Sequence, residues 1–431
     1  MLFMHTEDIK HVITSQREEM EELFKREKII ERDIITERLK KYLSHPNILA
    51  ILGVRRCGKS LFSWILLNNE KYGYINFFDE RLTSLKAEEL ERVLQAFYEL
   101  YGDIEYIIFD EIQNICGWER FISRLRTSKK IIITGSNSQL LSGELSTFLT
   151  GRHIDFELFP FNFKEYLTLN NIRVEKDWMY STRRVAEVKK MLENYILTGG
   201  FPETYKFGKK ILETIYSDII ENDILRRYGV KKPHALRELA KYTLSNFSNE
   251  ITFNKLKNII NLKDVHTVSR YVNYLCNAYL FFLVERFSFK LKEQFLAPKK
   301  IYCIDTGLIN LLSFRASENR GRLIENLVLV ELLRRKSYLF NDWEVYYWRD
   351  YQQAEVDFVI KDRLRVKHLI QVTNASGIDE IDARQIKSLT KASKQLKCKE
   401  LSIFTWDMED TLKKDGKKIK CRPLWKWLLE K

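Results

Sequence analysis

Short apolar runs alternate with polar segments of helical period from residue 47 to residue 161. Five of these runs are candidate strands: ILAILG, YGYINFFD, YIIFDE, KIIITGS and IDFELFPF. Runs that are apolar at nearly every position are typical of strands buried on both faces of a parallel sheet. Segments between them, such as SLKAEELERVLQAFYEL, have the period of crossover helices. The pattern therefore predicts an α/β fold with a doubly wound parallel sheet.

The pattern changes twice after this sheet. Residues 162–227 are expected to be helical, with a sharp turn at the sequence GGFPE. Residues 231–290 predict three helices and then the strand-like run FFLVERFSFK, which is the layout of a winged helix-turn-helix. From residue 299 onward, the helical segment GRLIENLVLVELLRRK precedes three strands, another helix and the strand LSIFTW. This order predicts a small independent α/β domain.

The segment ILGVRRCGKS interrupts an apolar strand with a glycine turn and continues into a helix. It fits the phosphate-loop pattern G-x-x-x-x-G-K-[ST] in the strand-to-helix context that the motif requires. The glycines allow backbone N–H groups to surround phosphates, and the helix N-terminus adds partial positive charge. We expect Lys59 to reach the β- and γ-phosphates of ATP and the Ser60 hydroxyl to bind Mg²⁺. The expected nucleotide-binding residues are Gly53, Val54, Arg55, Arg56, Cys57, Gly58, Lys59, Ser60 and Leu61.

Acidic and polar residues follow the next strands where ATP hydrolysis would require them. Asp110 and Glu111 end the strand YIIFDE, so we expect Asp110 to hold Mg²⁺ and Glu111 to act as general base on water. Thr134, Ser136 and Asn137 lie at the end of the next strand, where a polar side chain can sense the γ-phosphate. Arg152 either neutralises charge on the transferring phosphoryl group, in its own subunit or a neighbour's, or is an ordinary surface residue.

The order of these motifs resembles a family of prokaryotic AAA-type ATPases with a C-terminal domain of the restriction-endonuclease-like PD-(D/E)XK superfamily. The resemblance is carried by GVRRCGKS, IIFDEIQNICGWERF, IIITGSNSQLLSGELSTFLTGRHIDFELFPFNFKEYL and GGFPE, and it extends to the closing IKCRPLWKWLLE. It implies a P-loop NTPase sheet of AAA type with a helical lid, a winged-helix module and a nuclease-like α/β domain. It also implies that Arg152 is an arginine finger, because the family has its Gly-Arg pair at this place.

We accordingly expect five segments along the chain. They are an N-terminal helical extension (1–30), the AAA-type ATPase core (31–165), a helical lid (166–230), a winged helix-turn-helix (231–298) and a nuclease-like domain (299–431).

The expected nuclease-like domain departs from the acidic pattern of its superfamily. Metal-dependent cleavage in that superfamily uses a helix glutamate, a strand aspartate and then E-x-K on the next strand. Glu325 and Asp357 fit the first two positions, but Gln371 and Thr373 stand where the glutamate and lysine should be. Gln371 offers an oxygen without charge, and Thr373 cannot replace a cation. We therefore expect a vestigial nuclease site in a domain retained for packing or duplex binding.

The second helix of the expected helix-turn-helix lies within NLKDVHTVSRYVNYLCNAYL. Its residues Lys263, His266, Thr267 and Arg270 would project outward, toward a major groove if the partner is DNA. The alternative is that the module serves as a hinge or a protein-binding surface. The formal net charge of +13 fits a polyanionic partner and fits a merely lysine-rich surface equally well.

Composition narrows the class of protein. A chain of 431 residues with 45% hydrophobic and 30% charged residues predicts a globular protein of two or three domains. The six cysteines form no C-x-x-C pair, which argues against a disulfide framework or a zinc site. No apolar stretch reaches about 18 residues and the N-terminus lacks a secretory pattern, so we expect a cytoplasmic protein without a membrane span.

Together these features predict an ATPase whose nucleotide state moves a winged-helix and nuclease-like module. The expected partner of this module is double-stranded DNA, and a protein partner or a second copy of the chain are further candidates. One alternative is a nucleotide-gated regulatory switch with little turnover. A weaker alternative is an ATP-dependent DNA nuclease.

Overall fold

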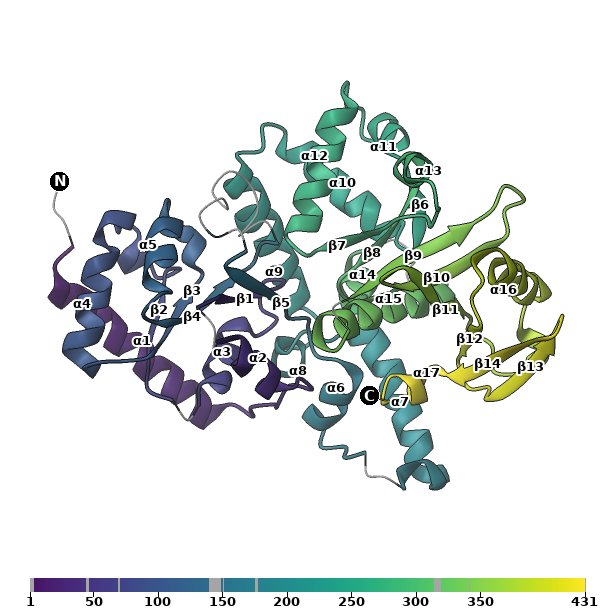
Figure 1. The fold of residues 1–431 in the computed structure, drawn as a ribbon, viewed down its shortest axis with the longest axis horizontal. Helices are drawn as coiled ribbons and strands as arrows, with labels where there is room; N and C mark the ends of the chain where they lie inside the picture. Colours follow the sequence, from purple (N-terminus) through teal and green to yellow (C-terminus); the bar gives the residue numbers. More distant parts are fainter. Residues whose placement is uncertain are drawn as a thin grey trace. The chain divides into compact units, whose positions relative to one another are not determined.

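The computed structural model describes residues 4–43, 46–68, 70–138, 149, 151–174, 177–313, 319–340 and 342–430. The chain divides into two compact units, residues 1–159 and 160–431 (Figure 1). Among the helices of the described residues, none is both long enough and apolar enough to cross a bilayer.

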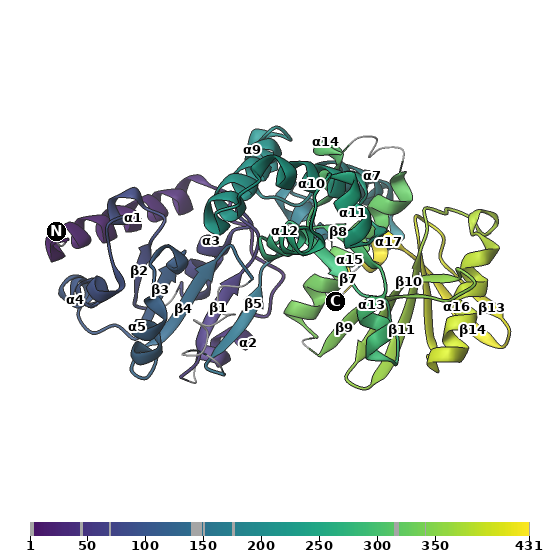
Figure 2. The same ribbon diagram turned by 90° about the horizontal axis from the view of Figure 1, so that it is seen from above.

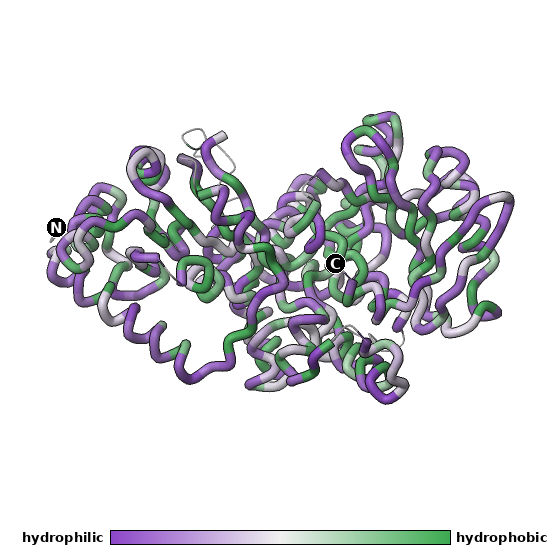
Figure 3. The backbone as a smooth tube through the Cα atoms, turned by 60° about the horizontal axis from the view of Figure 1, so that its bottom comes forward, coloured by the Kyte–Doolittle hydropathy of each residue, from purple (hydrophilic) through white to green (hydrophobic). Residues whose placement is uncertain are grey.

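The first unit is built on a five-stranded parallel sheet, as the sequence pattern predicted. Its strands are β1 (Ile48–Leu52), β2 (Tyr72–Asn76), β3 (Tyr106–Asp110), β4 (Lys130–Gly135) and β5 (His153–Glu157), in the order β2-β3-β4-β1-β5. Its helices are α1 (Thr6–Arg26), α2 (Thr36–Leu43), α3 (Lys59–Leu66), α4 (Leu90–Tyr101) and α5 (Trp118–Leu125). Each of the five expected apolar runs forms one of these strands, and their apolar stretches appear green in Figure 3.

The direction of the connections places helices on both faces of this sheet. The connection β1–α3–β2 crosses the sheet one way, and β2–α4–β3 and β3–α5–β4 return the other way. Because crossovers between parallel strands are right-handed, α3 covers one face while α4 and α5 cover the other (Figure 2). The carboxyl ends of β1, β3 and β4 consequently meet at one edge of the sheet, where the predicted phosphate loop and acidic pair lie.

Helix α1 protects the free edge of β2. The side-chain amide of Gln16 donates to the Asn76 carbonyl at 3.0 Å and accepts from the Asn76 N–H at 2.9 Å. The Gln16 amide thus occupies the backbone N–H and C=O of Asn76 in the way a neighbouring strand would. These groups are then unavailable for pairing with another chain. The N-terminal helical extension thus packs as part of the first unit.

The second unit contains two further sheets. A three-stranded antiparallel sheet has the order β6-β8-β7, with β6 (Asn249–Ile251), β7 (Phe281–Val284) and β8 (Lys299–Cys303). A six-stranded sheet has the order β13-β14-β12-β11-β10-β9, with β9 (Trp343–Arg349), β10 (Glu355–Asp362), β11 (Arg365–Val372), β12 (Glu400–Thr405), β13 (Asp410–Lys414) and β14 (Lys417–Pro423).

Helices connect and cover these sheets. They are α6 (Phe163–Leu169), α7 (Thr182–Thr198), α8 (Glu203–Phe207), α9 (Ile211–Asp218), α10 (Pro233–Ser245), α11 (Phe253–Ile259), α12 (Val265–Asn277), α13 (Leu291–Leu296), α14 (Thr306–Leu312), α15 (Arg320–Tyr338), α16 (Ala383–Leu396) and α17 (Leu424–Trp427). A π-helix over Ile219–Arg226 continues directly from α9.

Several strands of the second unit were not expected from the sequence. β6 has three residues and β8 begins with two lysines, so neither shows a long apolar run. β8 nevertheless pairs with β6 and β7, so the sheet that these three strands form continues past the expected segment boundary at residue 298. The β13–β14 hairpin is lysine-rich and mostly exposed, and its turn contains Asp415 and Gly416, a pair typical of tight hairpins.

The GGFPE turn forms a close contact within the second unit. The Gly200 N–H donates to Asp305 Oδ2 at 2.7 Å, and Asp305 also caps α14 through the Gly307 N–H at 2.8 Å. A Cβ at Gly199 would lie 1.9 Å from Asp305 Oδ1, and one at Gly307 would lie 2.3 Å from the Thr198 carbonyl. The absence of side chains therefore allows the end of α7 and the start of α14 to touch.

Candidate functional site

The loop from residue 53 to residue 58 joins β1 to α3 at the carboxyl edge of the first sheet. Gly53 has a φ of +154°, and a Cβ there would lie 2.2 Å from the Leu158 carbonyl oxygen. Gly58 has a φ of +97° and stands at the N-cap of α3. Only glycine adopts these conformations without strain at such close approach. A loop bent in this way ahead of a helix N-terminus is an anion-binding concavity.

The Lys59 ammonium folds back into this loop. Its Nζ donates to the Val54 carbonyl at 3.2 Å and lies 3.7 Å from Glu111 Oε1, and its side chain is 4% exposed. The structure thus brings together the predicted phosphate ligand and the predicted general base. Cys57, one of the expected loop residues, is buried, and its thiol lies 3.4 Å from the Leu158 carbonyl oxygen, on the side of the loop that faces the protein interior.

Arg32, which the sequence did not predict as a site residue, contacts the phosphate loop from a segment that precedes β1. Its guanidinium donates to the Cys57 carbonyl at 3.1 Å and to the Phe159 carbonyl at 2.5 Å. The residue is buried, so these carbonyl contacts connect the loop firmly to the chain that follows β5. No local motif marks Arg32, because its role depends on contacts 25 and 127 residues away along the chain.

Asp110 ends β3 and is fully buried. Its carboxylate accepts hydrogen bonds from the Tyr74 hydroxyl at 2.9 Å and from the Thr134 hydroxyl, and Ser60 is a further hydrogen-bonding neighbour. Burial, and then the nearby Glu111 carboxylate, raise the pKa of Asp110, while these hydrogen bonds oppose the rise. An ionised carboxylate in such surroundings gains from a cation, and the oxygens of Asp110 and Ser60 are the hard ligands that suit Mg²⁺.

Glu111 occupies a left-handed backbone conformation, with a φ of +51°. Its N–H donates to Thr134 Oγ1 at 3.0 Å, and its carboxylate accepts from the Gln113 amide. A non-glycine residue in this region stores backbone strain, a feature that clusters at functional sites. These contacts turn the Glu111 carboxylate toward Lys59 and away from the adjacent Asp110 hydrogen bonds.

Thr134 has a different role from the one expected. Instead of being available to a γ-phosphate, its hydroxyl is buried and joins the Asp110 carboxylate to the Glu111 N–H. Thr134 therefore fixes the relative position of the two acids. Asn137, two residues past the end of β4, is 6% exposed and remains the predicted γ-phosphate sensor.

Arg152 lies at the opposite end of the sheet from the phosphate loop. It directly precedes β5, whose first residue, His153, pairs in parallel with Ile48, the first residue of β1. The loop follows the last residue of β1, so a strand of five residues, about 16 Å long, separates the two positions. Arg152 is exposed and donates to Ser123 Oγ at 3.3 Å. The structure does not bring Arg152 to the site of its own chain.

The predicted DNA contacts lie on and just before α12. Lys263, His266 and Arg270 are exposed and Thr267 is half-buried. Asp264 caps the helix through the N–H groups of His266 and Thr267 at 3.0 and 2.9 Å. The opposite face is buried through Val268, Tyr271, Val272 and Leu275, whereas Val265, the first residue of the helix, is only half-buried.

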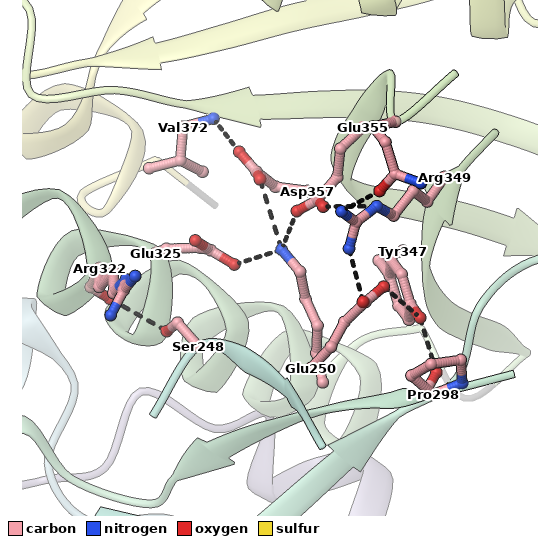
Figure 4. Close-up of polar contacts among 12 residues, drawn as sticks. Ser248, Glu250, Pro298, Arg322, Glu325, Tyr347, Arg349, Glu355, Asp357 and Val372 are labelled. Atoms are coloured by element: carbon pink, nitrogen blue, oxygen red, sulfur yellow. Dashed lines mark hydrogen bonds and ion pairs between the residues drawn. The ribbon is translucent and has the colours of Figure 1, made fainter. Parts of the chain in front are cut away.

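The two acids of the predicted vestigial nuclease site converge on a lysine. Lys300 Nζ, from β8, lies 2.9 Å from Glu325 Oε1, 2.6 Å from Glu355 Oε1 and 3.6 Å from Asp357 Oδ1. Figure 4 shows the carboxylates of Glu325, Glu355 and Asp357 directed toward this one ammonium group. The Tyr302 hydroxyl adds a hydrogen bond to Glu325 at 2.7 Å. Lys300 and Glu355 were not predicted as members of this site, because they are far from Glu325 in the sequence and only the folded strands β8 and β10 bring them close to it.

Gln371 and Thr373 complete the predicted set. The register that pairs Phe358 with Ile370 places Gln371 opposite Asp357 on the neighbouring strand. The Gln371 Oε1 atom is buried without a hydrogen-bond partner in the described parts of the chain. Thr373 lies just past β11, where its N–H donates to the Phe404 carbonyl at 2.9 Å.

A divalent metal ion does not fit at the Lys300 position. Mg²⁺ needs oxygen ligands at about 2.1 Å in octahedral geometry, and an ammonium group with a 4% exposed side chain already occupies the centre of the carboxylates. Burial lowers the pKa of Lys300, but the surrounding Glu325, Tyr302, Asp357 and Glu355 outweigh it and raise that pKa well above its usual value. Burial and Glu325 raise the pKa of Asp357 to about 8. Across the residues that the structure describes, no group of three or more His, Cys, Asp or Glu side chains is arranged to hold a metal.

Comparison with protein families assigns the first unit. A model for an AAA domain matches residues 45–167, and models for domains of unknown function match residues 189–319 (DUF8612) and 320–425 (DUF4143). The prediction of an AAA-type ATPase is confirmed at this level. The comparison does not identify residues 189–425 as a winged helix or a nuclease.

Two curated relatives cover most of the chain. The uncharacterized protein MJ1544 of Methanocaldococcus jannaschii is 37% identical over 435 residues, which are 95% of this chain and 93% of the relative. An uncharacterized protein of Haemophilus influenzae is 31% identical over 71% of this chain and 79% of the relative. Among solved structures, the Walker-type ATPase PABY2304 of Pyrococcus abyssi is similar over 67% of this chain and 97% of that one, at 18% identity and a TM-score of 0.45.

We expect Lys300→Ala to open a divalent-metal site among Glu325, Glu355 and Asp357, at the position that the ammonium group occupies in the natural chain. Removing the ammonium leaves buried carboxylates uncompensated and should cost about 3–5 kcal/mol of folding stability. Millimolar Mn²⁺ without nucleotide should then raise the melting temperature of the variant. The matched control is Lys299→Ala. Lys299 lies next to Lys300 on β8, but it is partly exposed and forms its ion pair with Glu285, outside the cluster. An equal Mn²⁺ response in the natural chain or in the control would contradict the interpretation.

Proposed function

This chain belongs to a family of archaeal and bacterial AAA-type ATPases, and on this premise we propose that it hydrolyses ATP at the carboxyl edge of the first sheet. The observation that carries the proposal is the meeting of Lys59, the Ser60–Asp110 pair and Glu111 at that edge. These are the cation, the metal ligands and the base that phosphoryl transfer to water requires.

Each residue has a distinct task in this proposal. The backbone of residues 53–58 and Lys59 receive the triphosphate, while Ser60 and Asp110 hold Mg²⁺. The metal ion, when bound, neutralises negative charge on the phosphates. Glu111 accepts a proton from the attacking water. Because a phosphate competes with Glu111 for the Lys59 ammonium 3.7 Å away, substrate binding frees the base carboxylate.

We further propose that Arg152 acts on ATP bound to a neighbouring copy of the chain. Its position at the amino edge of the sheet supports this, because a guanidinium at that edge cannot reach the loop at the carboxyl edge of the same sheet. A cation supplied by a neighbour would stabilise the charge of the transferring phosphoryl group. Hydrolysis would then depend on assembly into a homo-oligomer.

The second unit is proposed to carry a winged helix that binds duplex DNA. Support comes from the element order α10, β6, α11, α12, β7, β8 (Figure 1). Lys263, His266 and Arg270, on and just before α12, are exposed. For the C-terminal part, the helix α15, the antiparallel strands β9 to β11, the helix α16 and the parallel strand β12 support a nuclease-like fold. The ammonium of Lys300 argues against cleavage by that domain. The expected segment boundaries, with β8 added to the winged helix, remain proposals.

The role of ATP turnover is tested with Lys59→Ala and Glu111→Gln. Loss of a charge-assisted contact worth about 1.5–3 kcal/mol should weaken ATP binding about 10- to 100-fold in Lys59→Ala. Glu111→Gln should bind ATP normally and lose about 10²- to 10⁴-fold in turnover. Calorimetry and a steady-state phosphate-release assay measure both. Normal hydrolysis by either variant refutes the assignment, whereas tight binding with negligible turnover in the natural chain favours the regulatory-switch alternative.

The position of Arg152 predicts complementation between two inactive variants. Arg152→Ala should lose about 10³-fold or more in kcat while keeping ATP affinity, and Lys59→Ala should be inactive for want of the phosphate ligand. Mixing them should restore turnover, because a Lys59→Ala copy still offers Arg152 to an intact loop. The control variant is Arg26→Ala, which removes an exposed arginine of α1 that pairs with Glu22. This variant should hydrolyse ATP at the rate of the natural chain. Failure of the mixture to recover activity would rule out action between copies.

The DNA proposal predicts a salt-sensitive duplex affinity that depends on α12. Arg270→Glu should weaken binding at least tenfold, and Lys263→Gln should reduce the slope of log affinity against log salt by about one. Fluorescence anisotropy with a labelled duplex across a salt series measures both quantities. Arg237→Glu on α10, where the arginine pairs with Glu221, should bind as the natural chain does. If Arg237→Glu and Arg270→Glu lose duplex affinity equally, α12 is not the DNA-contact surface.

A further inference from the structure

A cavity of about 420 Å³ opens beside the Lys300 cluster, within the second unit. Its walls come from α10, β6 and α11 on one side and from β8, β9, β10 and α15 on the other. Pockets that hold small-molecule ligands typically measure between about 300 and 1,000 Å³. The cavity therefore has room for a ligand of nucleotide size.

The two carboxylates in the cavity wall are both neutralised by cations of the same wall. Glu250 accepts from Arg349 Nη1 and from the Tyr347 hydroxyl, the latter at 3.0 Å. Glu355 lies 2.6 Å from Lys300 Nζ and 3.7 Å from Arg349 Nε. Figure 4 shows Glu250, Arg349 and Glu355 linked in this way. These contacts weaken the repulsion between the two acids and an anionic ligand.

Two further cations of the wall make no ion pair with any described carboxylate. Lys255, on α11, and Arg322, on α15, both line the cavity and are exposed. The backbone carbonyl of Arg322 accepts from Ser248 Oγ at 3.1 Å, which connects the start of α15 to the segment before β6. Because Lys300 and Arg349 are already engaged by Glu250, Glu325, Glu355 and Asp357, Lys255 and Arg322 are the two lining cations left for a ligand.

Neutral polar groups complete the lining. The side chains of Tyr242 and Asn249 face the cavity and form no hydrogen bond with the part of the chain that the structure describes. A phenol and a carboxamide can each donate and accept hydrogen bonds. They suit the polar, uncharged portion of a ligand whose charged group lies at Lys255 and Arg322.

We propose that this cavity binds a phosphate monoester of nucleotide size, with the phosphate on Arg322 and Lys255. A phosphate monoester carries close to two negative charges at neutral pH, one for each of these two cations, whereas a single carboxylate would leave one of them without a counter-charge. Arginine presents a planar fork of donors that fits phosphate oxygens, and lysine adds a point charge. A free nucleotide and the phosphorylated end of a nucleic-acid strand share this chemistry.

The site is separate from the phosphate loop, because the two belong to different compact units. The experiment uses the full chain carrying Lys59→Ala, so that the loop contributes little binding. The probes are AMP and a short 5′-phosphorylated oligothymidylate, and adenosine and the unphosphorylated oligothymidylate are their matched controls. Binding is measured by calorimetry.

The phosphorylated probe should bind at least about tenfold more tightly than its unphosphorylated control. Adding Arg322→Gln and Lys255→Gln should abolish that preference, whereas Lys241→Gln, at an exposed lysine of α10 outside the cavity, should leave it unchanged. Binding of AMP identifies the ligand as a free nucleotide, and binding of the oligonucleotide alone identifies it as a strand end. Absence of a phosphate preference for both probes, or its persistence in the double variant, overturns the proposal.

Discussion

A carboxylate withdrawn from water must find a compensating partner, and two buried aspartates show opposite ways of meeting that requirement. Asp110 receives hydrogen bonds from neutral hydroxyl groups, which hold its position without cancelling its charge. Asp357 lies with two glutamates around the ammonium of Lys300. The first arrangement leaves a charge for an external cation, and the second supplies the cation from the chain itself. This difference separates the first unit, where metal-assisted chemistry fits, from the second, where it does not.

The polarity of the parallel sheet imposes a second constraint on the ATPase site. Every catalytic group that follows β1, β3 or β4 meets the others at one edge, while a residue that precedes a strand lies at the far edge. Arg152 precedes β5 and is therefore separated from its own phosphate loop by the length of a strand. This polarity is the reason why the proposed role of Arg152 requires assembly: in its own chain the side chain starts at the edge of the sheet opposite the phosphate loop.

Sequence patterns predicted what depends on neighbours along the chain. The five strands of the first sheet, the loop around Lys59 and the acids after β3 all follow from local apolar runs and motif spacing. The sequence could not predict contacts made across long separations. Arg32 supports the loop through carbonyls that only the folded sheet brings close, and Lys300 enters its cluster through the pairing of β8 with β6 and β7. Thr134 was placed correctly at the end of its strand, but its hydrogen bonds to the two acids depend on the lateral order of β3 and β4.

The Lys300 cluster and the adjacent cavity are physically complementary. Cleaving a phosphodiester by metal catalysis needs carboxylates whose charge is available to a divalent ion, and such charge would repel a phosphate in the absence of that ion. Because Lys300 and Arg349 contact the acids that line the cavity, the repulsion of an anion by these acids falls, and Lys255 and Arg322 are the lining cations that form no ion pair with a described carboxylate. The ammonium of Lys300 among these carboxylates and these two cations of the wall therefore both favour binding of a phosphate without metal-dependent cleavage.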